Sequence, residues 1–107
     1  MPKYSVLKMA RDLAQPFRPV EIAELDGAYH SFIVRYSGDF VAHSHKADEF
    51  IYLLEGQIEV EMGNETVEVK QGEALHIPAG VSHRPRCKNM ALALVIETKG
   101  LQVAGNE

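Results

Sequence analysis

Residues 38–56 read GDFVAHSHKADEFIYLLEG and combine a metal-ligand pattern with a strand pattern. From Glu49 to Leu54 the residues are mostly apolar and aromatic, which is typical of a β-strand. Side chains alternate between the two faces of a strand, so Glu49 should share the buried face with Ile51 and Leu53. An acid buried there without a partner costs several kcal/mol, and a metal ion or another cation is the usual remedy.

Two histidines precede this strand. His43 and His45 lie two residues apart, so in extended backbone both imidazoles project from the same face and could bind one ion. The chain has five histidines, and an HxH pair then arises easily by chance. The pair is therefore weak evidence by itself, and the glutamate four residues after His45 makes the pattern more specific.

A second segment, residues 72–83, reads GEALHIPAGVSH and adds a third imidazole. Its apolar part predicts a short strand that ends at Pro78, because proline cannot donate a hydrogen bond to a neighbouring strand. Gly80 then permits a sharp turn. This turn can redirect His83 toward the interior, so the two segments together supply three imidazoles and one carboxylate.

The rest of the chain predicts an all-β domain with a short N-terminal helical turn. Apolar and polar side chains alternate strictly in residues 57–62, and residues 66–70 repeat the pattern after Gly63-Asn64, which predicts a tight hairpin. Residues 9–15 favour one or two helical turns before a proline. Glycine turns divide the chain every 8–12 residues or so, the rhythm of a sandwich or barrel. The predicted strands span residues 18–25, 29–36, 49–54, 57–62, 66–69, 73–77 and 91–97.

In their order and spacing, the two segments resemble the two short motifs of the cupin family. Residues 38–56 follow the first motif, except that four residues instead of five separate the first glycine from HxH. Residues 72–87 follow the second motif, except that Cys87 stands where the family usually has asparagine. That departure concerns a structural hydrogen bond and no metal ligand. The resemblance spans about residues 30 to 97, most of the chain.

This resemblance implies a single cupin domain over residues 1–107, built as a double-stranded β-helix or jelly-roll barrel. It also implies one divalent transition metal (Fe, Mn, Ni, Zn, Co or Cu), bound by His43, His45, Glu49 and His83. Three neutral imidazoles and one carboxylate would leave a site of net charge about +1 with two open positions in an octahedral shell. The alternative is that the four polar side chains satisfy one another without a metal.

Other polar and aromatic residues are weaker candidates for the site. Four could line a pocket beside the metal: Tyr36, Tyr52, His76 and Arg84. Each has a plainer interpretation, because strand aromatics usually pack in cores and an arginine after a turn is usually solvated. His30 leads an alternating apolar row and fits a half-buried core histidine. Cys87 fits a small buried core residue better than a ligand.

Composition limits the partners. The chain has 11 Lys and Arg against 15 Asp and Glu, a net charge of −4, which removes the electrostatic basis for general binding to nucleic acid or anionic membranes. We expect small-molecule partners and, because the core is thin, a homodimer with the N-terminal arm, residues 1–26, at its interface. A single cysteine and no apolar leader or membrane span predict a cytoplasmic protein.

The sequence leaves two functions open. As an enzyme, the chain would use the open metal positions to bind a small oxygen-rich metabolite. Iron, manganese or copper would suit a dioxygenase, whereas zinc or nickel would suit an isomerase or lyase. As a binding or sensor module, the same pocket would hold a small ligand without chemistry.

Overall fold

The computed structural model describes residues 1–99, which form one short helix and seven strands. The helix is α1 (Val6–Arg11). The strands are β1 (Val20–Leu25), β2 (Tyr29–Asp39), β3 (Glu49–Glu55), β4 (Gln57–Met62), β5 (Glu65–Lys70), β6 (Ala74–Ile77) and β7 (His83–Thr98). Among the described residues, no helix is long and apolar enough to cross a membrane.

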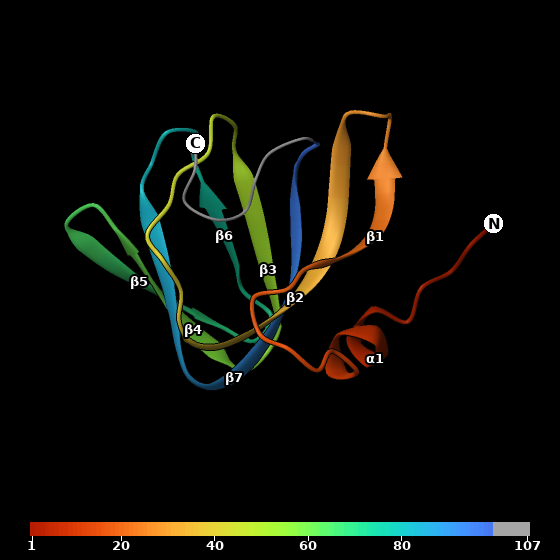
Figure 1. The fold of residues 1–107 in the computed structure, drawn as a ribbon, viewed down its shortest axis with the longest axis horizontal. Helices are drawn as coiled ribbons and strands as arrows, with labels where there is room; N and C mark the ends of the chain where they lie inside the picture. The colour runs from red at the N-terminus through yellow and green to blue at the C-terminus, as the bar shows by residue number, and fades with distance from the viewer. Residues whose placement is uncertain (100–107) are drawn as a thin grey trace.

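Strand β7 organises the sheet. Its C-terminal half lies between β2 and β3, in the order β1-β2-β7-β3-β6, and its N-terminal half pairs with β4, which also pairs with β5. All pairings are antiparallel, and register shifts in β2 and β3 bend the strands. Figure 1 shows the strands curving around a common interior. The predicted all-β jelly-roll fold is therefore confirmed.

The local predictions hold best for the hairpin. Strands β4 and β5 pair from Gln57 with Lys70 to Met62 with Glu65, so Gly63-Asn64 is a two-residue turn as predicted. The N-terminal helix is real but lies at Val6–Arg11, three residues earlier than predicted. Packing explains the shift, since Ala10 is fully buried against the sheet, and Val6, Leu7 and Met9 of the same helix pack against the same apolar cluster.

Two apolar clusters lie on opposite faces of the sheet. The interior cluster follows the period-two alternation of the strands and comprises Phe32, Val34, Tyr36, Ile51, Leu53, Ile58, Val60, Val69, Ile77, Cys87, Ala91, Ala93 and Val95. The outer cluster forms where α1 covers Ile33 of β2 and Leu92 of β7. Several residues of the interior cluster also line the cavity described below.

Gly56, between β3 and β4, provides a test of this packing. Its φ is +86°, and a Cβ there would lie 2.5 Å from the Met90 carbonyl oxygen. Gly72 has a similar φ of +84°, but a Cβ there would meet no described atom within 4 Å. Gly72→Ala should therefore cost only the left-handed backbone penalty, about 1–2 kcal/mol. Gly56→Ala adds a backbone clash and should cost about 3 kcal/mol or more. Denaturant unfolding of both variants measures this, and equal losses would contradict the close approach.

Candidate metal centre

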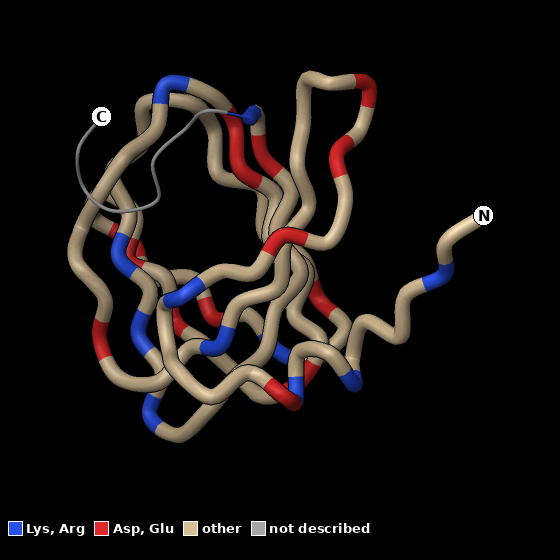
Figure 2. The backbone as a smooth tube through the Cα atoms, turned by 45° about the vertical axis from the view of Figure 1, so that its right-hand side comes forward, with Lys and Arg blue, Asp and Glu red and all other residues tan. Residues whose placement is uncertain are grey.

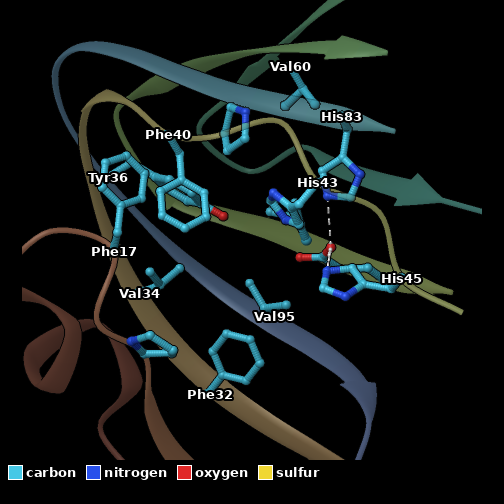
Figure 3. Close-up of a pocket in the computed structure, with 14 residues that line it drawn as sticks. Phe17, Phe32, Val34, Tyr36, Phe40, His43, His45, Val60, His83 and Val95 are labelled. Carbon is cyan, nitrogen blue, oxygen red and sulfur yellow. Dashed lines mark ion pairs between the residues drawn. The ribbon is translucent and has the colours of Figure 1, made fainter. Parts of the chain in front are cut away.

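Three segments bring four polar side chains together inside the barrel. His43 and His45 lie on the loop after β2, Glu49 is the first residue of β3, and His83 is the first residue of β7. All four are buried, and one ligating atom from each lies within 4.8 Å of the other three. Figure 3 shows the labelled histidines converging on this point. The structure thus brings together the residues that the two sequence motifs singled out.

Backbone contacts fix two of the imidazoles. His43 and His83 form an isolated β-bridge, with reciprocal N–H to carbonyl hydrogen bonds of 2.9 and 2.8 Å. Their Nδ1 atoms lie 3.0 Å from the Val41 carbonyl and 2.9 Å from the Val81 carbonyl, respectively. Because a carbonyl oxygen only accepts, each Nδ1 must donate a proton to it. In the neutral imidazole, Nε2 then keeps its lone pair, as a metal ligand requires.

Glu49 faces these imidazoles. Its Oε1 lies 3.3 Å from Nε2 of His83 and 3.4 Å from Nε2 of His45. Neither Glu49 Oε1 nor His83 Nε2 has a hydrogen-bond partner among the described residues, although both atoms are buried. Buried polar atoms without a hydrogen-bond partner are costly, and a cation bound by both atoms would remove that cost. The donor set therefore fits a metal ion.

The protonation states also suit a metal ion. Burial raises the pKa of Glu49, but the adjacent His45 and His83 outweigh it and lower that pKa to about 2. Burial lowers the pKa of His43 below its ordinary value, an effect that its contact with the Val41 carbonyl only partly offsets. At neutral pH the site thus holds an ionised carboxylate and a neutral His43, the forms that bind metal.

The four side chains form one end of a small cavity. Its remaining wall is apolar and aromatic: Phe17, Pro19, Phe32, Val34, Tyr36, Phe40, Ile51, Val60, Pro85 and Val95. The volume is about 40 Å³. Burial, reinforced by the charge of Glu49, strongly raises the pKa of Tyr36, so its hydroxyl remains protonated and able to donate.

Of the four pocket candidates, only Tyr36 lines this cavity. Tyr52 points outward from β3, out of phase with the buried residues on either side of it. His76 is exposed on the outer face and contacts Asp48 at 2.8 Å. Arg84 pairs with Glu61 at 3.1 Å on the outside of β7. Each of the three lies at the outward parity of its strand, which explains its distance from the site.

Two features of the interior were not anticipated from the sequence. Glu97 of β7 lies opposite Glu49 in the strand register and is almost completely buried, with His30 at 3.3 Å. Burial and the charge of Glu49 raise the pKa of Glu97. Its alternation with Ala93 and Val95 was an available signal. Phe17 also faces the cavity, from a loop whose sequence carries no strand or motif pattern.

Comparisons with known proteins place this geometry in a family. Residues 31–97 match the family model described as a cupin domain. A cupin-2 domain protein from Shewanella frigidimarina has the same fold, with a TM-score of 0.85 and 28% identity over 90% of this chain and 94% of that one. A hydroquinone 1,2-dioxygenase from Sphingomonas, with 4-hydroxybenzoate bound, has a TM-score of 0.79 and 20% identity over 96% of this chain and 77% of that one, a likeness of fold alone.

A curated relative is "Polyketide synthase CurC" from Streptomyces cyaneus, 31% identical over 80 residues. The match covers 74% of this chain and 52% of the relative, so the chain spans about half the length of that protein. The family model, by contrast, covers well over half of this chain, including both motifs and all four converging side chains. The chain therefore belongs to the cupin family.

Proposed function

We propose that the chain binds one divalent transition metal through His43, His45, Glu49 and His83 and acts on a small oxygen-rich metabolite. The observation that carries this proposal is the convergence of four buried donors on one point beside an apolar cavity. When bound, Fe, Mn, Ni, Zn, Co or Cu supplies Lewis acidity and, for the redox-active metals, electron transfer. Dioxygenase, isomerase and lyase chemistry are all compatible with such a centre.

The chain's own residues have distinct roles in this proposal. Glu49 supplies the negative charge of the site, and the backbone contacts of His43 and His83 orient their Nε2 atoms. The protonated Tyr36 hydroxyl donates a hydrogen bond to an oxygen of the substrate. The apolar wall offers few polar groups that could hold water beside the reacting centre.

The relatives agree with an oxygen-rich substrate. Hydroquinone and 4-hydroxybenzoate both carry oxygen on a small carbon skeleton, and polyketides carry it along a chain. These molecules belong to the other proteins, and they support the class of substrate for this chain without fixing its identity.

Oxygen uptake tests the catalytic proposal. Protein reconstituted with Fe²⁺ should consume oxygen or convert one of three probes: a 2-oxo acid, a 1,2-diketone or a catechol. His83→Ala, treated in the same way, should be inactive because it lacks one of the four donors. Tight binding of a probe that is then recovered unchanged would contradict catalysis and indicate a non-catalytic binding or sensor module.

We also propose a homodimer that forms across the β1 edge of the sheet. Strand β1 lies at the end of the strand order, and its residues Val20 and Leu25 are exposed, as is Tyr29 at the start of the neighbouring strand β2. Exposed edges and apolar side chains favour pairing with another strand. Light scattering at micromolar concentration should give twice the chain mass of 11.9 kDa. Leu25→Lys should shift it toward one chain, and a wild-type mass of one chain would contradict the dimer.

The charge distribution supports small-molecule partners in place of nucleic acid. Figure 2 shows acidic and basic positions interspersed along the chain. On β7, Arg84 and Arg86 pair with Glu59 and Glu61 of the neighbouring strand β4. These cations are therefore already neutralised within the protein.

Cys87 is buried as a free thiol, which supports a cytoplasmic location.

A further inference from the structure

Phe17 connects the N-terminal segment to the candidate metal centre. It lies between α1 and β1, outside the residues matched to the family, yet it lines the same cavity as the four donors. Its ring stacks on Phe40 with a centroid separation of 4.5 Å and an interplanar angle of 18°. Phe40 in turn meets the His43 ring edge-on at 5.4 Å. An unbroken series of ring contacts thus leads from Phe17 to a candidate ligand (Figure 3).

The backbone of Phe17 is held in an unfavourable conformation. Its φ is +59°, in the left-handed region that an aromatic residue rarely adopts. Its N–H donates to the Arg35 carbonyl at 2.8 Å, and its ring also meets Tyr36 edge-on at 5.8 Å. Such strain persists only where surrounding contacts maintain it, and it is frequent at functional sites. Here the maintaining contacts are those of the cavity wall.

The cavity that Phe17 lines is smaller than an aromatic ring needs. About 40 Å³ is room for roughly three water molecules, since a cavity needs about 10–15 Å³ to hold one. A cavity that admits benzene measures about 150 Å³. With Phe17 in place, an aromatic ring therefore has no room beside the four donors. Removing the Phe17 side chain would free a space of about ring size against the face of Phe40.

We propose that Phe17 is a specificity-determining residue: its ring, stacked on Phe40, fills the space of an aromatic ligand and restricts the site to small acyclic oxygen donors. The inference rests on the proposed metal centre. It narrows the substrate class of that centre from oxygen-rich molecules in general to short acyclic ones. The hydroxyl of Tyr36 is buried, and Figure 3 shows it beside Phe40 on the His43 side, where it could meet such a donor.

Two probes with the same chelating group test this inference. Acetohydroxamate and benzohydroxamate bind metals through the same two oxygens, but only the second carries a ring. Both are titrated into protein loaded with Co²⁺, whose visible absorption changes when a ligand binds. Wild-type protein should bind acetohydroxamate more tightly than benzohydroxamate. Phe17→Ala should bind benzohydroxamate about tenfold more tightly than wild type, or better, with little change for acetohydroxamate.

Two further variants complete the design. Phe17→Gly removes the ring and also relieves the backbone, since glycine adopts a positive φ freely, so it should fold even if Phe17→Ala does not. Tyr4→Ala removes an exposed aromatic from the same N-terminal segment and should bind both probes like wild type.

The outcomes separate the two proposals. If cobalt binds and acetohydroxamate changes its spectrum, but benzohydroxamate binds wild type and the Phe17 variants equally, the specificity role of Phe17 is refuted and the metal centre stands. If cobalt does not bind wild-type protein, the metal centre is refuted and this inference with it.

Discussion

Glu49→Gln is expected to reduce metal content from about one ion per chain to background. The substitution keeps the size of the side chain and one acceptor oxygen, but it replaces the second oxygen with an NH₂ donor and removes the charge. In the wild type that charge is present at neutral pH, since the pKa of Glu49 is about 2. A neutral amide is a weaker ligand and leaves the cation without its one anionic donor, so affinity should fall about a hundredfold or more. Elemental analysis and calorimetric titration measure both quantities.

The chain offers a matched control for this experiment. His76 is a metal-ligating residue type, but it is exposed on the outer face and pairs with Asp48. His76→Ala should therefore keep the full metal content, whereas His83→Ala should lose it as Glu49→Gln does. Full retention by Glu49→Gln and His83→Ala together would show that the ion, if one binds, lies elsewhere.

Metal binding is also expected to stabilise the fold strongly. A ligand at one hundred times its Kd stabilises the native state by about 2.7 kcal/mol. For a domain of this size, that corresponds to a rise in Tm of roughly 10–20 °C. The structural reason is local, because an ion would be the partner that the buried Glu49 Oε1 and His83 Nε2 atoms lack among the described residues. Calorimetry with added metal and with chelator measures the difference.

This stabilisation should depend on pH in a defined direction. Metal binds neutral imidazoles, so the gain should shrink as pH falls through the histidine range and protons compete. Burial lowers the pKa of His43, so this imidazole stays neutral to a lower pH than an exposed histidine does. Glu49 makes a separate contribution, because its pKa falls from the ordinary value of 4.5 to about 2 on folding. Its ionised carboxylate therefore stabilises the fold fully above pH 4.5, and this stabilisation is lost as the pH falls toward 2. Equal Tm values with metal and with chelator at neutral pH would contradict the account.

The positions that could be predicted from the sequence are those that the backbone geometry of neighbouring residues determines. The hairpin of β4 and β5 came from strict alternation on both sides of Gly63-Asn64, and the structure has that turn and register. The inward position of Glu49 came from its phase with Ile51 and Leu53. His83 was harder, because it required a turn at Pro78 and Gly80 to redirect the chain. In each case backbone geometry within a few residues decides the outcome.

The residues that sequence reasoning missed depend on long-range packing. Phe17 faces the cavity because its backbone is anchored to Arg35 of β2, a contact that no local pattern indicates. The start of β7 also escaped prediction, since the proline in this segment argues against a strand. In the structure, Pro85 pairs with Val60 in the β4–β7 ladder. Tyr52 and His76 are a different case, because each is out of phase with the buried residues of its predicted strand, and this alternation was an available signal that they face outward.

Elemental analysis after equilibrium dialysis tests the central claim most directly. Protein purified without chelator or nickel affinity resin is dialysed against a mixture of divalent transition metals, and its metal content is compared with that of His83→Ala. The account predicts about one ion per wild-type chain and background levels in the variant. No bound ion in the wild type, or equal amounts in both proteins, would contradict it.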